Sequence, residues 1–120
     1  MTREDAEALI KHMYQAFNDN DLEAANIIFA PNFYSHPLGS KGPESIKKAW
    51  AAMRAAFPMA HTIINDIVID GEKVATRTTL KGVPSTDDPA SDATVMEIIH
   101  IEKGQIVEIW GVMNARMSHS

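Results

Sequence analysis

The side chains of this sequence that could do chemistry are its histidines, carboxylates and phenols, because the chain contains no cysteine. Without thiols it has no disulfide, no thiolate ligand for zinc and no cysteine nucleophile. The histidines form no His-x-His or His-x-x-x-His pair, the spacings that bring two imidazoles to one metal ion. The pattern favours acid/base chemistry, and we expect no metal and no other cofactor. The histidines are His12, His36, His61, His100 and His119.

The composition describes one acidic globular domain. Of 120 residues, 45% are hydrophobic and 22% are charged, and the length is typical of one domain, so we expect a single domain over residues 1–120. The 11 Lys and Arg residues against 16 Asp and Glu residues give a net charge of −5, which would repel nucleic acid and anionic membranes. No apolar stretch is long enough to span a bilayer, and the first residues lack the apolar core of a secretory signal. We therefore expect a cytoplasmic protein without nucleic-acid or membrane partners.

The first half of the sequence predicts three helices. Thr2 can cap a helix whose apolar residues recur at helical spacing as far as Phe17. A shorter helix follows Asp21 and is expected to end at Pro31, because proline cannot continue the hydrogen-bond ladder. The third helix is predicted over residues 43–57, with a proline at its first position and another just beyond its end.

The second half predicts long strands rich in Ile, Val and Thr, joined by glycine turns and by one polar loop at 83–92. A short aromatic segment at 33–37 suits an edge strand. Helices followed by a meander of strands indicate an α+β domain. We expect a cone-shaped, curved, antiparallel-rich sheet of four to five strands with three N-terminal helices packed on one face, whose open end can hold a small molecule. The predicted long strands are 62–70, 73–82, 93–102 and 105–114.

The turn between the last two strands decides which side chains share a face, because a shift of one residue reverses every side chain of a strand. A two-residue loop at Lys103-Gly104 would put Trp110 and Asn114 on the opposite face from His100. A three-residue loop that includes Glu102 would bring them to one face, and we favour it. The cavity wall would then hold Met96, Ile98, His100, Glu108, Trp110, Val112 and Asn114. The reverse face would hold Ile99, Ile101, Val107 and Ile109, which a second copy of the chain could cover.

Several short strings follow one another in a characteristic order over most of the chain. They are Tyr14-Gln-Ala-Phe-Asn18 with Asp21-Leu22, Phe29-Ala30-Pro31, His36-Pro37, Ala56-Phe57-Pro58, Gly71-Glu-Lys-Val74-Ala75-Thr-Arg77 and Gly104-Gln-Ile106-Val107-Glu108-Ile109-Trp110. In this order they resemble the SnoaL-like branch of the nuclear-transport-factor-2-like superfamily. The resemblance implies a cone-shaped α+β barrel, usually dimeric. This barrel hosts cofactor-free acid/base chemistry in polyketide cyclases, ketosteroid isomerase, scytalone dehydratase and limonene epoxide hydrolase, and many members only bind.

The resemblance also implies roles for individual residues. In the SnoaL-like cyclases the acid/base group is an aspartate four residues after the tryptophan of the Glu-x-Trp string, and here that position is Asn114, which cannot exchange a proton near neutral pH. A histidine on the neighbouring strand of those cyclases corresponds to His100. His36 lies where ketosteroid isomerase carries its general base. We therefore predict that His36 acts as the base, while His100 and Asn114 hold the carbonyl or enolate oxygen.

Further side chains are predicted to contact a substrate. Tyr14 stands one residue out of step with the first-helix tyrosine of ketosteroid isomerase and could donate a hydrogen bond to a bound carbonyl. Trp110 could stack on a ligand or fill the cone. Glu108 could pair with Arg77 inside the cone or form a salt bridge at its rim. The strand carboxylates are Asp66, Glu97 and Glu108. The predicted substrate contacts are Tyr14, Tyr34, Met96, Ile98, Glu108, Trp110 and Val112.

Three functions stay open at this point. The leading hypothesis is a cofactor-independent enzyme of the isomerase, cyclase or dehydratase (lyase) kind, acting on a small hydrophobic carbonyl compound. The alternative is a non-catalytic small-molecule-binding or dimerisation module, which Asn114 favours because the family aspartate is missing. The third is a protein-interaction domain that uses the outer sheet face. We expect a homodimer formed through that face.

Overall fold

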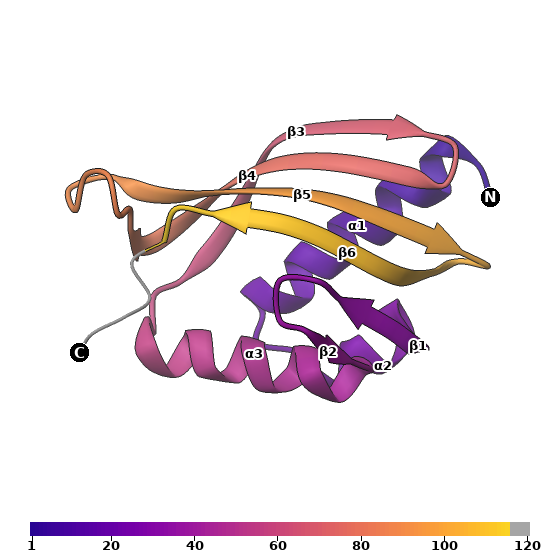
Figure 1. The fold of residues 1–120 in the computed structure, drawn as a ribbon, viewed down its shortest axis with the longest axis horizontal. Helices are drawn as coiled ribbons and strands as arrows, with labels where there is room; N and C mark the ends of the chain where they lie inside the picture. The colour runs from indigo at the N-terminus through magenta and orange to yellow at the C-terminus, as the bar shows by residue number, and fades with distance from the viewer. Residues whose placement is uncertain (116–120) are drawn as a thin grey trace.

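Helices from the first half of the chain pack against a six-stranded sheet, drawn in Figure 1. The computed structural model describes residues 1–115. The α+β prediction is confirmed, although the sheet has more strands than the four to five expected. The helices are α1 (Arg3–Asn18), α2 (Ala25–Ile28) and α3 (Pro43–Ala56), with a 3-10 turn at Leu22–Ala24. The strands are β1 (Phe29–Ser35), β2 (Ser40–Lys41), β3 (His61–Asp70), β4 (Lys73–Pro84), β5 (Asp92–Glu102) and β6 (Gln105–Met113).

The strands lie in the order β2-β1-β6-β5-β4-β3, in which β3 to β6 form the predicted antiparallel meander and β1 joins β6 in parallel. Because β1 begins at Phe29, the prediction that the second helix continues to Pro31 is wrong. In an extended chain Phe29 and Phe33 point to the same side, where both are buried with ring centroids 4.7 Å apart. Pro31 lies where the pairing with β6 shifts, so its missing amide costs no regular ladder bond.

Helix α1 begins and ends where local chemistry favours it. The Thr2 hydroxyl accepts a hydrogen bond from the Asp5 amide at 3.0 Å, and the Asp5 carboxylate accepts one from the Thr2 amide at 3.1 Å. Beyond its last turn, Asn20 has a φ of 57°, in the left-handed region that ends helices. The buried stripe of α1 faces the sheet and carries one polar side chain, Tyr14, among Ala6, Ile10, Met13, Ala16 and Phe17.

The turn between β5 and β6 has two residues, so the predicted three-residue loop is wrong. Lys103 and Gly104 both have positive φ, 52° and 77°, which fits a tight type I′ hairpin turn. A bulge then inserts Val107, and the register beyond it pairs His100 with Glu108 and Ile98 with Trp110. The predicted sharing of one face by these even-numbered residues is therefore confirmed, although a bulge within β6 produces it.

The face assigned to that group was wrong. The fully buried Ile99, Ile101 and Ile106 pack with Ile10 and Ile28 of the helices in the main core, and Figure 1 shows α1 crossing behind the strands on this side. Amphipathic helices bury their apolar stripes best against the sheet face richest in β-branched side chains. The even-numbered side chains of β5 from Met96 to His100 and those of β6 beyond the bulge, with their histidine, carboxylate and indole, therefore lie on the outer face. No helix within residues 1–115 is long and apolar enough to cross a membrane.

Candidate active site

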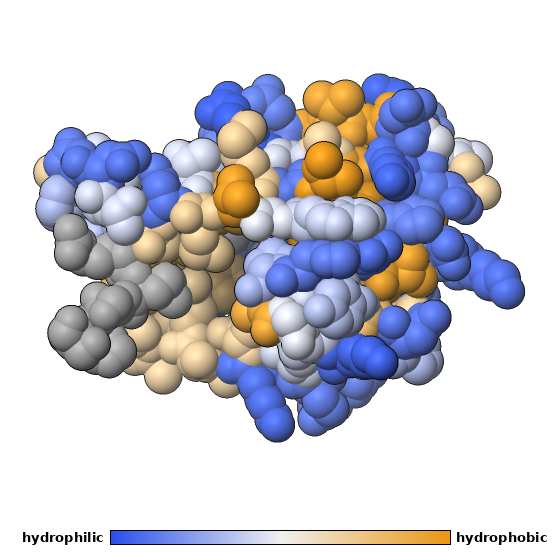
Figure 2. Space-filling view, in the orientation of Figure 1, coloured by the Kyte–Doolittle hydropathy of each residue, from blue (hydrophilic) through white to orange (hydrophobic). Residues whose placement is uncertain are grey.

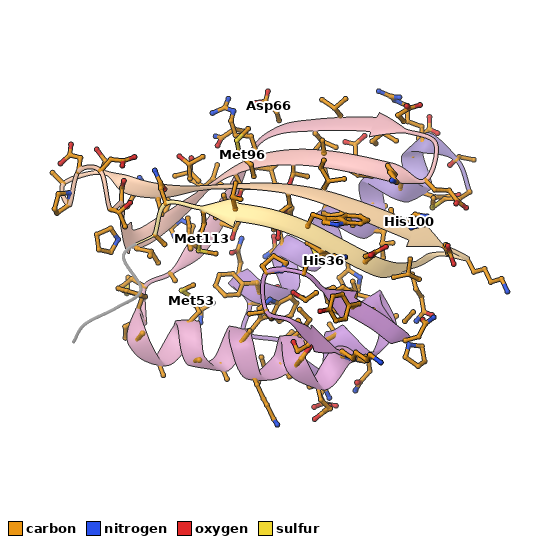
Figure 3. The ribbon with its side chains drawn as sticks, in the orientation of Figure 1. His36, Met53, Asp66, Met96, His100 and Met113 are labelled. Carbon is orange, nitrogen blue, oxygen red and sulfur yellow. The ribbon has the colours of Figure 1, made fainter. Side chains whose placement is uncertain are left out.

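A cavity of about 520 Å³ lies between the inner sheet face and helices α1 and α3. Its wall is mainly apolar and includes Phe17, Phe29, Trp50, Leu80 and Ile109. Its mouth is marked by lining residues that are also exposed: Leu38 (50%), Met113 (47%) and Val112 (72%). Figure 3 shows Met53 on α3 and Met113 at the end of β6, both on the wall of this gap between helix and sheet. In Figure 2 the surface over the C-terminal part of α3, at the lower left, is mildly hydrophobic, whereas the surface over its N-terminal part is largely hydrophilic.

One hydrogen-bonded carboxyl group lies on this apolar wall. Glu97 comes from the inner face of β5, and the Tyr14 hydroxyl donates to its Oε1 at 2.6 Å. The same phenol oxygen lies 2.7 Å from Thr76 Oγ1. Because a phenol has one proton, the Thr76 hydroxyl donates to Tyr14. Tyr14 and Thr76 are 8% and 4% exposed, so the phenol and threonine part of this chain is shielded from water, whereas Glu97 is half-buried on the cavity wall.

The surroundings of Glu97 favour its protonated form. Burial raises the pKa of the Glu97 carboxyl, and the hydrogen bond from Tyr14 only partly opposes this rise. Burial, and then the charge and hydrogen bond of Glu97, also raise the pKa of the Tyr14 phenol. The residues that line the cavity include no Lys, Arg or His to pair with the carboxylate. A carboxyl group whose pKa is raised in an apolar cavity takes up and releases its proton at higher pH than an exposed glutamate, which suits it to acid/base work.

Gly111 gives Glu97 the space to lie over the neighbouring strand. The two residues are directly paired between β5 and β6. A Cβ atom at position 111 would come within 3.0 Å of Glu97 Cγ and 3.1 Å of the Met96 carbonyl oxygen. Because Gly111 has no side chain, the Glu97 side chain can lie over β6 at this position.

Polar groups beside Glu97 are few. Besides Tyr14, the lining residues that carry hydroxyl groups are Ser35, Thr62 and Thr78. The Ser35 hydroxyl accepts from the Leu38 amide, and the Thr78 hydroxyl donates to the Val95 carbonyl. Within residues 1–115 no group of three or more His, Asp and Glu side chains is arranged to hold a metal ion. The lining chemistry thus fits a small, mainly apolar and uncharged molecule.

The predicted base His36 lies outside this cavity, on the outer sheet face. Its Nε2 is 2.6 Å from Glu108 Oε2, and its ring stacks on that of Trp110 with centroids 4.8 Å apart and planes 9° apart. The Tyr34 ring meets it edge-on at 4.8 Å. Lys73 Nζ is 5.4 Å from the Trp110 centroid. We call His36, Glu108, Trp110 and Tyr34 the outer clamp.

The other predicted site residues on β5 are also outside the cavity. His100 Nε2 lies 3.6 Å from carboxylate oxygens of both Glu72 and Glu102, near the far end of β5 in Figure 3. Met96 and Ile98 are 50% and 47% exposed on the outer face. The expectation that His36, His100 and Asn114 converge on one enclosed volume is therefore wrong. Of the predicted substrate contacts, two line the cavity, namely Tyr14 and Val112.

Two further predicted roles are replaced by other contacts. Arg77 pairs with Asp66 on the outer face, with Nε to Oδ2 at 2.7 Å, and Glu108 pairs with His36. Asn114 Oδ1 accepts a hydrogen bond from the Thr94 amide at 2.7 Å, and its Nδ2 donates to Asp87 at 3.3 Å. Asn114 thus fastens the loop between β4 and β5 to the end of β6, and it is not on the cavity wall.

Sequence reasoning named Glu97 as a strand carboxylate and gave it no role. The signal was present, because Glu97 interrupts the apolar alternation Val95, Ile99 and Ile101 on one face of β5. A lone carboxyl on the face that packs against helices must be buried, paired or placed in a cavity. The error was to take the face with the histidine and indole as the inner one.

The fold and this wall define a class: α+β pocket proteins whose cavity holds a single carboxyl and phenol pair. A family model described as the SnoaL-like domain matches residues 10–109. The chain therefore belongs to the SnoaL-like family, and the resemblance seen in the sequence is confirmed.

Solved structures share the fold over almost the whole chain. Wild-type IdmH from Streptomyces antibioticus is 27% identical, with 91% of each chain covered and a TM-score of 0.76. TsrD from Streptomyces laurentii is 23% identical over 95% of this chain and 91% of its own, with a TM-score of 0.79. A SnoaL-like polyketide cyclase from Agrobacterium tumefaciens is 16% identical, covers 90% of each chain and has a TM-score of 0.77. The last two likenesses concern the fold alone. A search of curated proteins found no match.

Proposed function

We propose that this protein is a cofactor-independent enzyme of the cyclase or isomerase kind, which moves a proton on a small hydrophobic carbonyl compound. Glu97 is the proton-exchanging group in this proposal. The observation that carries it is a single carboxyl group with a raised pKa on an apolar cavity wall, held by the Tyr14 hydroxyl at 2.6 Å. Membership in the SnoaL-like family supports the same reaction class.

The chemistry requires one group that works in both directions. The Glu97 carboxylate removes a proton from the carbon beside the carbonyl, which leaves an enolate and a neutral carboxylic acid. That acid returns the proton to another carbon in an isomerisation. In a ring closure, the enolate carbon instead attacks a second carbonyl and the acid protonates the new alkoxide. Tyr14 acts as a positioning residue, because its proton is directed to Glu97 Oε1 and fixes that carboxyl group.

The experiment is exchange of the α-hydrogens of 2-tetralone, an apolar enolisable ketone, followed by NMR in deuterated buffer. We expect the wild type to accelerate exchange, and Glu97→Gln to lose about 10²-fold to 10⁴-fold of that acceleration, the usual range for one acid/base group. The matched control is Glu102→Gln, which removes an exposed carboxyl from the same strand. Exchange by Glu97→Gln at the wild-type rate would overturn the proposal.

A non-catalytic binding module is the second candidate. It is favoured by the position at which the family resemblance places an acid/base aspartate, because Asn114 there is occupied by the Thr94 amide and Asp87. A wild-type protein that binds apolar ketones without accelerating their exchange would support this candidate over the enzyme.

We also propose that the protein forms a homodimer through the outer sheet face. Four exposed apolar side chains lie on that face of β3, β5 and β6: Val68 (62%), Met96 (50%), Ile98 (47%) and Val112 (72%). In Figure 2 hydrophobic surface is interrupted by hydrophilic surface over these strands. Both signs of charge are present, as in the Arg77 and Asp66 pair, so a copy related by a two-fold axis can present opposite charges to each.

A further inference from the structure

The turn that follows β1 reaches both sides of the sheet. The His36 amide donates to the Ile109 carbonyl at 3.0 Å, which continues the pairing of β1 with β6. The next two residues, Pro37 and Leu38, line the cavity. Gly39, with a φ of 64°, returns the chain toward β2, and its amide donates to the Ser35 carbonyl at 2.8 Å. One short turn therefore carries an outer side chain and two residues of the cavity wall.

The outer clamp fixes this turn by its first side chain. The His36 imidazole is held at two sides, by the Glu108 carboxylate at 2.6 Å and by the face of Trp110 at 4.8 Å. The His36 and Glu108 side chains are 39% and 32% exposed, so the pair is neither fully solvated nor closed to water. Both partners belong to β6, a central strand of the sheet. The clamp thus anchors a peripheral turn on a rigid element.

Other charged groups near the clamp have partners of their own and do not compete for His36 or Glu108. Lys73 of β4 lies over the Trp110 ring at 5.4 Å. His100 of β5 is paired opposite Glu108, but its imidazole lies between the carboxylates of Glu72 and Glu102. Each of the two outer-face histidines therefore has carboxylate neighbours of its own.

We propose that His36 is a positioning residue for the cavity, which holds Pro37 and Leu38 at the mouth and so determines the size of ligand that binds. Leu38 is 50% exposed, and the hydrogen bond from its amide to Ser35 Oγ, at 3.2 Å, lies within the same turn. When the clamp is lost, the turn opens, small ligands lose contact with Leu38, and larger ligands enter more easily. The inference rests on the cavity of the proposed function as the ligand site, but it does not require that Glu97 moves a proton.

The test is binding of two neutral fluorescent probes, 2-naphthol and the larger 1-hydroxypyrene. Loss of part of one leucine contact corresponds to roughly fivefold weaker binding of 2-naphthol by His36→Ala. The preference for 2-naphthol over 1-hydroxypyrene should fall by a larger factor. Hydrogen exchange of the amides in residues 36–42 should become faster. His12→Ala, which removes an exposed histidine from α1, is the control and should leave all three readouts unchanged.

A second variant breaks the clamp from the opposite side. Glu108→Ala substitutes no residue of the turn itself. It should nevertheless change the probe preference and the hydrogen exchange of the turn amides in the same direction as His36→Ala. The double variant should match the stronger single variant, because both remove one contact. Folded His36→Ala and Glu108→Ala proteins with wild-type probe preference would overturn the inference, as would a wild type that binds neither probe. Absence of 2-tetralone exchange, with probe binding intact, would count against the proposed enzyme alone.

Discussion

Two carboxyl groups of this protein accept or share a hydrogen bond of the same length and serve different ends. Glu97 meets the Tyr14 hydroxyl at 2.6 Å inside the cavity, and Glu108 meets the His36 imidazole at 2.6 Å on the outer face. Tyr14 is 8% exposed, whereas the outer pair is about one third exposed. The inner pair has no cationic partner among the cavity-lining residues. The outer pair includes a group that can itself become cationic.

The difference shows that the surroundings of a side chain, and not its type alone, decide which chemistry it can do. Histidine and carboxylate form the more familiar acid/base pair. On the outer face, however, the His36 and Glu108 pair is open to water and stacked on Trp110, and we propose that it only holds the turn in place. Burial in an apolar wall makes the charged form of a glutamate costly, and this cost raises the pKa of Glu97 and supports its proposed role in proton transfer.

The largest effect should come from the outer face. Ile98→Glu places a charge in the centre of the proposed dimer interface, where burial without a partner is costly, and should weaken dimerisation by about 100-fold or more. Analytical ultracentrifugation measures it. Ile27→Glu is the control, because Ile27 is 69% exposed on a different part of the surface. If the wild type is monomeric, or if both variants dimerise normally, the outer face is not the interface.

The inner pair should reveal itself in the pH dependence of stability. Because the pKa of Glu97 is raised in the folded protein, the folded state keeps this proton to higher pH than the unfolded chain does. Its contribution to stability is complete below the unfolded pKa, about 4.3, and is lost as pH rises through the folded pKa. Each unit between the two pKa values corresponds to about 1.4 kcal/mol.

Glu97→Gln should remove the loss of stability that ionisation of Glu97 causes at high pH. The variant should therefore have a higher free energy of unfolding than the wild type at pH 8, although it exchanges 2-tetralone more slowly. Urea unfolding at pH 5 and pH 8 measures the difference. Glu102→Gln, which removes an exposed carboxyl, should keep the wild-type change in the free energy of unfolding between pH 5 and pH 8. If this change is the same in Glu97→Gln and the wild type, Glu97 titrates as an ordinary surface carboxyl.

Much of the fold was predictable because its signals are local. The Thr2 cap, the α1 stripe, Pro43 at the start of α3 and the glycine turns between strands all act within a few residues. The parallel pairing of β1 with β6 was not predictable in this way, because its partners are more than seventy residues apart and share no turn.

The site was less predictable than the fold for one physical reason. Alternation divides β5 and the part of β6 beyond the bulge into two groups of side chains, but it does not say which group faces the helices. The isoleucines of β5 indicate the inner face, because Ile99 and Ile101 pack in one core with the apolar stripe of α1. Once that face is turned inward, Glu97 enters the cavity and His36, His100 and Trp110 leave it.

The smallest predicted effect concerns Asn114, which contacts neither the Glu97 and Tyr14 pair nor the His36 and Glu108 pair and instead bonds Thr94 and Asp87. Asn114→Asp keeps the acceptor for the Thr94 amide but places a carboxylate 3.3 Å from that of Asp87, where the asparagine now donates. Like charges at this distance should destabilise the loop between β4 and β5 by about 1 kcal/mol. Hydrogen exchange of residues 84–92 and urea unfolding measure it. Asp87→Asn in the same variant should restore most of the loss, because the repulsion is removed. No gain in 2-tetralone exchange over the wild-type rate is expected, since the side chain at 114 is held outside the cavity. A gain of exchange by Asn114→Asp would move the acid/base centre away from Glu97 and toward the end of β6.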